Sequence, residues 1–452
     1  MHIKKWLPFL LVAVLLFALA GCGDGKQPNE PDSNDPTYIA APTGAPDYSA
    51  YKETSEFPIG AWLGSHSFTK DYCTYAKEAG ITFFDGFRAA YYPNGGVAKR
   101  IAYMEETGMK AIVSLMGITY QEYANSTIID SPAFMGFGFY DEPSYAQFGT
   151  LETNANDFIT KHPDKNAYIN LLPVYSSLGQ LGTDSYEKYI KGFVEQVPSV
   201  SQLSVDYYPL LGETVGGTLI LANYLAQSWL SNMELCANEA KSAGKDLWCF
   251  IQTMSYGSDR RPPKSMADIT FQNYVNMCYG VKGLQYFCFD TPNVSSEFST
   301  YDYGMLDRNG EPTEIYTFVK EANEELSTFS YAYLQFEWEN CMPVYGTKDA
   351  GVNFESFDML QSPLTTSDYF AATADYNALV GQFTDKDGYK GYMLANFSDP
   401  LDNQSTNITL TFNANKILVF ANGTEEIVSI PEGVYTCELK PGEGRFVVPF
   451  ND

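Results

Sequence analysis

The chain has 452 residues, of which 18% are charged and 45% hydrophobic, as expected of a packed protein with one large domain and a smaller one. Its formal net charge of −27 argues against a nucleic-acid partner, because a polyanion would be repelled whereas a neutral sugar would not. With 3 histidines and 8 scattered cysteines, the sequence supports no zinc site, disulfide framework or Ser-His-Asp triad. We therefore expect no metal and no cofactor.

The first 21 residues are predicted to be a secretion signal, because a basic start is followed by an apolar run from Trp6 to Ala20. A plain signal peptide or a membrane helix is the alternative, although the run is shorter than the ~20 residues that span a bilayer. Leu19-Ala20-Gly21-Cys22 resembles the lipobox of bacterial lipoproteins. The resemblance implies lipidation at Cys22 and a protein exported and anchored to the bacterial cell membrane, facing outward.

Residues 22–50 are rich in Gly, Asp, Asn and Pro and carry almost no large apolar side chain, so they are predicted to form a flexible tether. Residues 51–330 are predicted to form a (β/α)8 barrel. From Phe57 to about Pro292, short apolar runs alternate with longer amphipathic ones, which is typical of a parallel sheet with crossover helices.

Eight apolar runs can be counted, and eight strands close a (β/α)8 barrel of ~250 residues. A doubly wound open sheet is the competing architecture, but no Gly-x-Gly-x-x-Gly turn opens the first helix. The runs are Ile59–Trp62, Ile81–Asp85, Ala111–Leu115, Met135–Glu142, Ala167–Leu171, Leu203–Asp206, Leu247–Gln252 and Gly283–Asp290.

The pattern changes after a helix predicted from Glu314 to about Phe329. From Leu379 onward, short alternating segments are separated by Asp-Gly, Asn-Gly and Pro-Gly turns. This pattern is typical of a small antiparallel β-sandwich. We therefore predict a C-terminal β-sandwich over residues 331–452.

The segment Phe137–Pro143 is the most informative motif, because an apolar strand runs into two carboxylates and is then stopped by proline. Proline cannot donate a ladder hydrogen bond, so Glu142 should stand at the carboxyl end of its strand, which is the mouth of such a barrel. The alternative is that Asp141 and Glu142 merely cap the following helix.

Acidic residues end the even-numbered predicted strands: Asp85, Glu142, Asp206 and Asp290. Inward side chains of one barrel layer come from alternate strands, so the four acids are predicted to converge at one level of the mouth. Such a ring is costly unless some acids are protonated, a cation lies among them, or substrate hydroxyls fill the site. The alternative is a strand frame that is wrong by one residue, with some acids facing helices.

Aromatic residues also stand at the strand ends, where ring faces can stack on sugars while hydroxyl groups bond at the edges. Packing in the core is the competing explanation. The predicted substrate-binding residues are Trp62, Asp85, Tyr140, Asp141, Tyr207, Tyr208 and Gln252.

A barrel with Glu before Pro at the end of strand four, an aromatic mouth and a trailing β-domain resembles the retaining (β/α)8 glycoside hydrolases of the clan that includes β-galactosidases and cellulases. It is similar in particular to glycosidase-like surface lipoproteins of gut bacteria. The resemblance spans Phe57 to Pro292 and implies that Glu142 is the general acid/base. That family usually has Asn before this Glu, whereas Asp141 stands here.

A larger departure lies on strand seven, where the clan places its nucleophilic Glu and this chain has Gln252, whose amide cannot form a glycosyl ester. Three interpretations stay open. Asp206, or less favourably Asp290, is the second catalytic carboxylate, for example as the base of an inverting pair about 6.5–9.5 Å apart. Otherwise the barrel binds a glycan without cutting it, or the substrate supplies its own nucleophile. The sequence thus predicts a glycoside hydrolase acting on an oligo- or polysaccharide, with a non-catalytic glycan-binding lipoprotein as the alternative.

Overall fold

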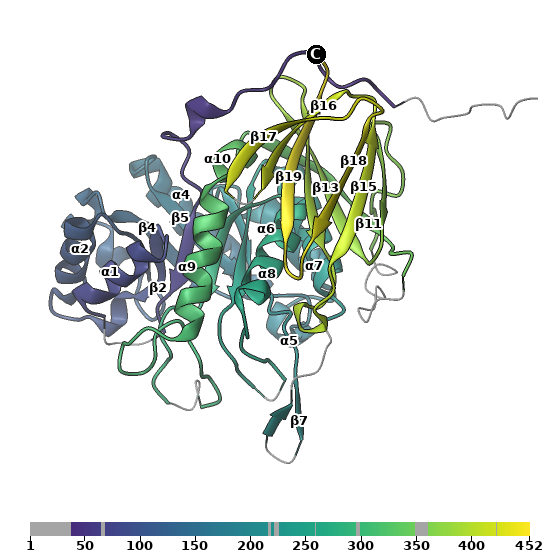
Figure 1. Cartoon of the computed structure of the whole chain (residues 1–452). Helices are drawn as coiled ribbons and strands as arrows, with labels where there is room; N and C mark the ends of the chain where they lie inside the picture. The colour runs from purple at the N-terminus through teal and green to yellow at the C-terminus, as the bar shows by residue number, and fades with distance from the viewer. Residues whose placement is uncertain are drawn as a thin grey trace, which may run out of the picture. The chain divides into compact units, whose positions relative to one another are not determined.

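Eight parallel strands close into a barrel in the order β1-β10-β9-β6-β5-β4-β3-β2 (Figure 1). The computed structural model describes residues 38–64, 68–215, 218–220, 226–257, 259–294, 299–348, 360–421 and 423–452. The barrel strands are β1 (Ile59–Trp62), β2 (Phe83–Arg88), β3 (Lys110–Ser114), β4 (Phe134–Asp141), β5 (Asn166–Leu171), β6 (Gln202–Val205), β9 (Asp246–Gln252) and β10 (Val281–Phe287). All eight predicted strands are confirmed. The open sheet is excluded, because β1 pairs with both β2 and β10.

The helices that cover the barrel carry an apolar stripe. In α4, Phe148, Leu151, Ala155 and Phe158 recur at helical spacing and are buried. Gly108 ends α2 with a φ of 76°, a conformation that glycine adopts without strain. The helices are α1 (Lys70–Glu78), α2 (Gly96–Thr107), α3 (Tyr120–Tyr123), α4 (Phe148–Lys161), α5 (Leu178–Leu181), α6 (Tyr186–Gln196), α7 (Trp229–Ala243), α8 (Met266–Cys278), α9 (Glu314–Ser327) and α10 (Ser330–Tyr333), and a small hairpin pairs β7 (Glu213–Val215) with β8 (Thr218–Ile220). None of the helices within the described ranges is both long enough and apolar enough to cross a membrane.

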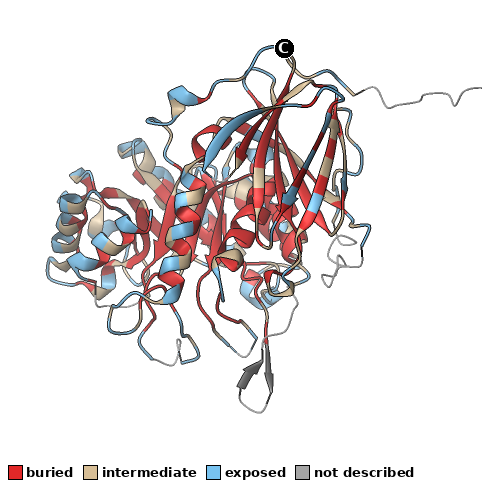
Figure 2. Cartoon of the chain, in the orientation of Figure 1, coloured by how far each residue is buried: buried red, intermediate tan, exposed pale blue. Residues whose placement is uncertain are grey.

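The C-terminal part is a β-sandwich, as predicted. A six-stranded antiparallel sheet has the order β11-β13-β14-β19-β16-β17, and a three-stranded sheet has the order β12-β15-β18. Buried residues follow the barrel strands and the strands of the six-stranded sheet (Figure 2). This sheet is buried on both faces: in β14, Met393 and Ala395 belong to the core shared with the barrel, whereas Tyr392 and Leu394 belong to the core between the two sheets. The strands are β11 (Phe336–Val344), β12 (Phe370–Ala374), β13 (Ala378–Asp385), β14 (Lys390–Asn396), β15 (Thr406–Phe412), β16 (Lys416–Ala421), β17 (Thr424–Ser429), β18 (Val434–Leu439) and β19 (Gly444–Phe450).

A fully buried ion pair joins the barrel to the sandwich. Arg261 donates from its two terminal nitrogens to both carboxylate oxygens of Asp268, at 2.9 and 2.8 Å. It also approaches Asp399 of the sandwich at 3.5 Å. Burial, partly offset by hydrogen bonding and by Arg261, raises the pKa of Asp399 to about 6. The guanidinium therefore compensates buried acids of both parts, so the two parts are coupled electrostatically as well as by packing.

The flexible tether predicted over residues 22–50 is too long, because its last part, from Ile39 onward, is bound to the sandwich. Ile39 and Ala41 donate backbone hydrogen bonds to Asp368 and Asn413 of the sandwich, at 2.7 and 2.9 Å. Tyr48 is 4% exposed and donates its hydroxyl to Asp385 at 2.8 Å. Composition alone does not reveal that one aromatic anchor and the backbone donors fix this segment. The predicted signal, Cys22 and the rest of the tether up to residue 37 lie outside the described residues.

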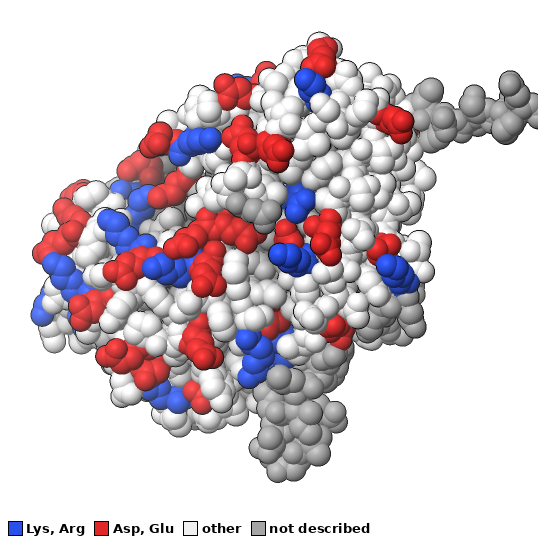
Figure 3. Space-filling model, viewed as in Figure 1, with Lys and Arg blue, Asp and Glu red and all other residues white. Residues whose placement is uncertain are grey.

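Acidic and basic side chains are interspersed on the face of the molecule shown in Figure 3. On this face, acidic side chains alternate with basic ones, mainly over the barrel part, and do not gather into one acidic patch.

Candidate active site

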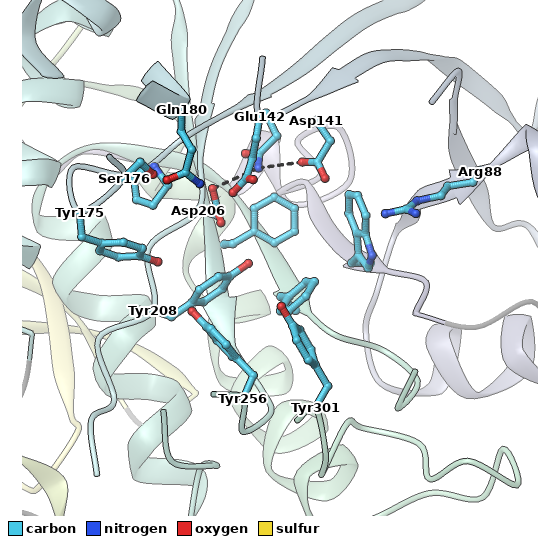
Figure 4. A pocket seen from close by; sticks show the side chains of 15 residues that line it. Arg88, Asp141, Glu142, Tyr175, Ser176, Gln180, Asp206, Tyr208, Tyr256 and Tyr301 are labelled. Atoms are coloured by element: carbon cyan, nitrogen blue, oxygen red, sulfur yellow. Dashed lines mark hydrogen bonds between the residues drawn. The ribbon is translucent and has the colours of Figure 1, made fainter. Parts of the chain in front are cut away.

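A cavity of about 280 Å³ opens at the carboxyl ends of the barrel strands (Figure 4). Trp62 ends β1, Asp141 ends β4 and Asp206 directly follows β6, and all three side chains line the cavity. The cavity therefore lies at the barrel mouth, where parallel strands deliver their last residues. Its lining combines three carboxyl groups, Arg88, Asn170 and a set of aromatic rings: Trp62, Tyr175, Tyr208, Phe250, Tyr256, Phe287 and Tyr301.

The backbone turns sharply at Glu142, which is the residue after β4. Its φ of 56° is the left-handed conformation that non-glycine residues rarely adopt. The turn is held on both sides: the Glu142 amide donates to the Asn170 carbonyl at 2.9 Å, and Tyr189 donates its hydroxyl to the Pro143 carbonyl at 2.7 Å. Residues in such conformations cluster at functional sites.

The carboxyls of Asp141 and Glu142 do not cap the next turn. That role belongs to Ser144, which forms a capping box with Gln147 at the start of the short 3-10 turn Tyr145–Gln147. The capping interpretation is therefore wrong, and both acidic side chains line the cavity instead.

The carboxyl groups of Glu142 and Asp206 lie within hydrogen-bonding reach of each other. Desolvation, reinforced by the charge of Asp141, raises the pKa of Glu142 to about 7. Asp206 is 7% exposed, and desolvation with the charges of Glu142 and Asp141 holds its pKa well above the usual range. Glu142 as a whole residue is exposed, since it projects into an open cavity, but protein surrounds its carboxyl group closely enough to penalise the charge.

Asn170 of β5 bridges the acids of the two neighbouring strands. Its side-chain nitrogen donates to Asp141 and to Asp206, each at 3.3 Å (dashed lines in Figure 4). Its side-chain oxygen accepts from Ser204 at 3.1 Å, so the amide is held with its nitrogen toward the acids. Sequence reasoning missed Asn170, although a polar residue near the end of an apolar strand, two residues after Tyr168, was the available signal.

The acids face an aromatic wall. In Figure 4, Asp141, Glu142 and Asp206 lie on one side of the cavity and Tyr208, Tyr256 and Tyr301 on the other. These tyrosines belong to one cluster of packed side chains that also contains Trp62, Phe250 and Phe287. Tyr256 and Tyr301 stack with ring centroids 5.2 Å apart. The cavity thus has one ionisable side and one apolar, aromatic side.

Arg88 and Tyr301 also line the cavity, but neither was predicted from the sequence. Arg88 ends β2, which extends three residues beyond the predicted end at Asp85, and its guanidinium lies over the Trp62 ring at 5.8 Å. Tyr301 comes from the long segment after β10, where no periodic pattern marks a position. The predicted residues that line the cavity are Trp62, Asp141, Glu142, Asp206 and Tyr208.

The predicted ring of four acids is wrong. Asp290 is 1% exposed, does not line the cavity, and accepts from the Gly64 backbone at 2.7 Å, so it fixes the segment after β1. Asp85 is fully buried, and its carboxyl oxygens have no hydrogen-bond partner among the described residues. The ring of Trp62 packs against Gly86, next to Asp85, and it is this ring that faces the cavity.

Three further predicted residues do not line the cavity. Tyr140 is only partly buried yet is not part of the lining, and Tyr207 is fully buried with its hydroxyl 2.7 Å from the Ser228 hydroxyl. Gln252 is also fully buried: its side chain donates to the Arg261 carbonyl at 2.7 Å and accepts from the Leu210 amide at 2.9 Å. Gln252 therefore ties two loop segments together.

Within the described residues, no three His, Cys, Asp or Glu side chains are arranged to hold a metal ion. Cys249 and Cys288 are fully buried, as expected of small core residues.

No protein-family model matches the sequence, and no curated protein matches it. Among solved structures, the chain is similar to a β-galactosidase from the psychrophilic Marinomonas ef1, with 9% identity over 61% of this chain and a TM-score of 0.42. The chain spans 60% of the length of that protein. It is also similar to a family 39 glycoside hydrolase from the gut symbiont Bacteroides cellulosilyticus WH2, with 10% identity over 88% of this chain and 82% of that one and a TM-score of 0.39. A further similar structure is described as a glycoside hydrolase, with 12% identity over 88% of this chain and 93% of that one and a TM-score of 0.48. These similarities assign no activity and no residue role to this chain.

Proposed function

We propose that this protein is a glycoside hydrolase that cleaves a glycosidic bond of an oligo- or polysaccharide by carboxyl acid/base catalysis. The observation that carries the proposal is the pair formed by Glu142 and Asp206, two carboxyl groups in hydrogen-bonding reach at one side of a cavity whose other side is aromatic. Such a pair serves proton transfer, whereas a site that only binds sugar needs no acid held in its protonated form at neutral pH.

Glu142 is the proton donor. A general acid works best when its pKa is near the working pH, and the pKa of Glu142 is raised to about 7. Both carboxyl groups line the cavity, but Glu142 is the exposed residue of the pair and Asp206 the buried one, so a glycosidic oxygen can reach Glu142 more easily. Glu142 therefore combines access to substrate with a proton available near neutral pH.

Asp206 is the partner carboxyl, ahead of Asp290. When one member of such a pair ionises, the other holds its proton more firmly, because like charges disfavour a second ionisation. Carboxyls in hydrogen-bonding reach do not fit the about 6.5–9.5 Å of an inverting pair. Asp290 is committed to the Gly64 backbone and does not line the cavity, so it takes no part.

The aromatic cluster supplies the sugar platform. Ring faces such as those of Trp62 and Tyr208 can pack against the C–H surface of a pyranose, and the tyrosine hydroxyls can bond to its edge. A cavity of about 280 Å³ lies at the small end of the roughly 300–1,000 Å³ typical of ligand sites. We therefore propose that the cavity binds one or two sugar rings.

A glycan-binding protein without turnover is the second candidate. It is favoured by Gln252, because the end of β9 carries a buried, structurally committed amide at the position where the clan has its nucleophile. The two candidates differ in turnover, because both predict sugar affinity.

The test is a screen of the soluble ectodomain on aryl glycosides and on plant, host and microbial oligosaccharides, followed by Glu142→Gln on every hit. Loss of the proton donor should lower the rate by roughly 2–4 orders of magnitude and leave sugar affinity nearly intact. Glu426→Gln makes the same chemical change at an exposed position of β17 and should leave the rate unchanged. Binding without turnover across the panel would establish the second candidate, and an unchanged rate in Glu142→Gln would refute the assignment of the acid.

We also propose that the protein is anchored outside the cell through lipid on Cys22. Support comes from the lipobox-like Leu19-Ala20-Gly21-Cys22 after a basic and apolar leader. A Cys22→Ala variant should leave the detergent phase and appear in the soluble fraction. Partitioning that does not change on this substitution would contradict the anchor.

A further inference from the structure

The carboxyl groups of the cavity all lie on one side of it. Among the described lining residues, the carboxyl groups are those of Asp141, Glu142 and Asp206, which come from the ends of β4 and β6. They face aromatic rings in Figure 4. An enzyme nucleophile has to approach the sugar carbon on the face opposite the bond that the acid protonates. Across the described part of the cavity from these acids lie Tyr208, Tyr256 and Tyr301, so no carboxyl group among the described lining residues stands opposite Glu142.

We propose that the nucleophile is the 2-acetamido group of the substrate itself, so that the substrates are β-linked 2-acetamido-2-deoxyhexosides; this inference rests on the proposed glycoside hydrolase function. Substrate-assisted hydrolysis of this kind needs one general acid and a polar group that holds the acetamide, and it needs no enzyme carboxylate on the opposite face. It also accounts for a third carboxyl, Asp141, beside a pair that already provides the proton.

In the first step, the acetamide carbonyl oxygen forms a bond to C1 while the bond from C1 to the leaving oxygen breaks. The proton of Glu142 passes to that leaving oxygen, which departs as the alcohol of the remaining glycan. In the second step, a water oxygen attacks C1, the bond from C1 to the acetamide oxygen breaks, and a water proton returns to Glu142. The net reaction is hydrolysis with retained configuration, and no oxidant, metal or cofactor takes part.

Asp141 is the residue that accepts the acetamide N–H in this scheme. As the acetamide oxygen bonds to C1, positive charge develops on the nitrogen, and a neighbouring carboxylate stabilises it. Asn170 positions the two aspartates, because its side-chain nitrogen donates to both of them at 3.3 Å. Asp206 is engaged with Glu142 and acts as the positioning partner of the acid.

The aromatic side of the cavity can accommodate the methyl end of the substrate's acetamido group. The acetamide ends in a methyl, whose burial against the cluster of Trp62, Phe250 and Phe287 is favourable by the hydrophobic effect. The β linkage follows from geometry: in a gluco- or galacto-configured sugar, the 2-acetamido oxygen reaches C1 only from the face opposite a β-oriented leaving group.

The first experiment compares hydrolysis of five aryl glycosides by the wild-type ectodomain: the β-linked N-acetylglucosaminide and N-acetylgalactosaminide, the α-linked N-acetylglucosaminide, the β-glucoside and the β-galactoside. We expect turnover of at least one β-linked acetamido sugar, at a kcat/KM at least about 100-fold above the matched sugar with a 2-hydroxyl group. Replacing the acetyl hydrogens of that substrate one by one with fluorine should lower the rate stepwise, because a poorer carbonyl nucleophile slows the first step.

The second experiment measures binding of a 2-acetamido sugar in which sulfur closes the acetamide onto C1 as a stable thiazoline. This compound mimics the bicyclic intermediate and should bind at least about 100-fold more tightly than the free sugar, as transition-state-like ligands do. Asp141→Asn should remove most of that gain, while Glu426→Gln should leave it intact. This readout does not depend on turnover.

The outcomes separate the two proposals. Equal turnover of the β-glucoside or β-galactoside and the acetamido sugar would overturn the substrate-assisted inference and leave the glycoside hydrolase proposal standing, as would a rate that fluorine does not alter. No turnover of any acetamido sugar together with no binding of the thiazoline would overturn the substrate-assisted inference, whereas the glycoside hydrolase proposal would fall only if the whole panel of glycosides and oligosaccharides gave no turnover.

Discussion

The carboxyl of Glu142, which follows β4, lies within hydrogen-bonding reach of the carboxyl of Asp206, which follows β6, across the end of an intervening strand. Asn170 of that intervening strand, β5, donates to Asp206 and so helps to hold the arrangement. Two acids brought together away from bulk water disfavour double ionisation, which keeps a proton on the pair at neutral pH.

The first prediction concerns the pH dependence of activity. The pKa of Glu142 is raised to about 7, mainly by desolvation, and the acid form is the reactive one. Activity measured as kcat/KM should therefore fall as the pH rises through about 7, because the proton donor is lost. A profile that keeps rising up to pH 9 would contradict the assignment of Glu142 as the acid.

The second prediction concerns Asp141→Asn. The charge of Asp141 raises the pKa of Glu142, so its removal should lower that pKa and shift the alkaline limb of the kcat/KM profile to lower pH. The shape of the two profiles, recorded with the same substrate, gives the shift directly. A substitution that reduced activity only by loosening the site would lower the profile without moving it.

The third prediction concerns stability and rests on Asp85. Desolvation holds the pKa of this fully buried carboxyl well above its usual range. The native state therefore binds the proton more tightly than the unfolded state, and stability is lost as the pH rises from the unfolded pKa of about 3.9 through the folded one. Asp85→Asn removes this loss, so its melting temperature should match the wild type near pH 4 and exceed it at pH 8.

The matched control for Asp85 is Asp387→Asn, the same change at an exposed position. In Asp387→Asn, the difference between the melting temperatures measured near pH 4 and at pH 8 should be the same as in the wild type. Equal melting temperatures of wild type and Asp85→Asn at pH 8 would show that the buried carboxyl is compensated.

The fourth prediction tests the structural role of Gln252. In Gln252→Glu the donor to the Arg261 carbonyl is lost and a carboxyl is buried. Because an unsatisfied buried polar group costs about 1–3 kcal/mol, we expect a lower free energy of unfolding and no gain in turnover. Gln121→Glu, at an exposed position of α3, should leave stability nearly unchanged. Higher turnover in Gln252→Glu would mean that this side chain reaches the cavity.

The sequence was sufficient to predict the architecture because strand and helix signals are local. The runs Ile59–Trp62 and Leu247–Gln252 are short and apolar, and each matches a strand to within one residue of the predicted bounds, whereas the ends of β2 and β10 differ from the prediction by three residues. The switch to antiparallel strands is likewise marked by Asp-Gly, Asn-Gly and Pro-Gly turns. These patterns reflect burial and turn geometry, which the residues themselves dictate.

The site was only partly predictable because the direction of a side chain at a strand end depends on contacts between distant residues. Glu142 reaches the cavity through a left-handed turn, and Asp290 turns to the Gly64 backbone. Gln252 is held by Leu210 and the Arg261 carbonyl. No periodicity in the sequence encodes these three orientations. Acids and amides that look equivalent at the predicted strand ends therefore differ in whether they line the cavity.

The central claim is that Glu142 protonates the leaving group, and its most direct test varies that group. For whichever sugar the screen identifies, kcat/KM of the wild type and of Glu142→Gln is measured with a dinitrophenyl leaving group, which departs without a proton, and with an alkyl alcohol, which needs one. The account predicts that Glu142→Gln keeps most of its activity on the dinitrophenyl glycoside and loses roughly 10²–10⁴-fold on the alkyl glycoside. Equal losses on both glycosides, or no loss on either, would contradict it.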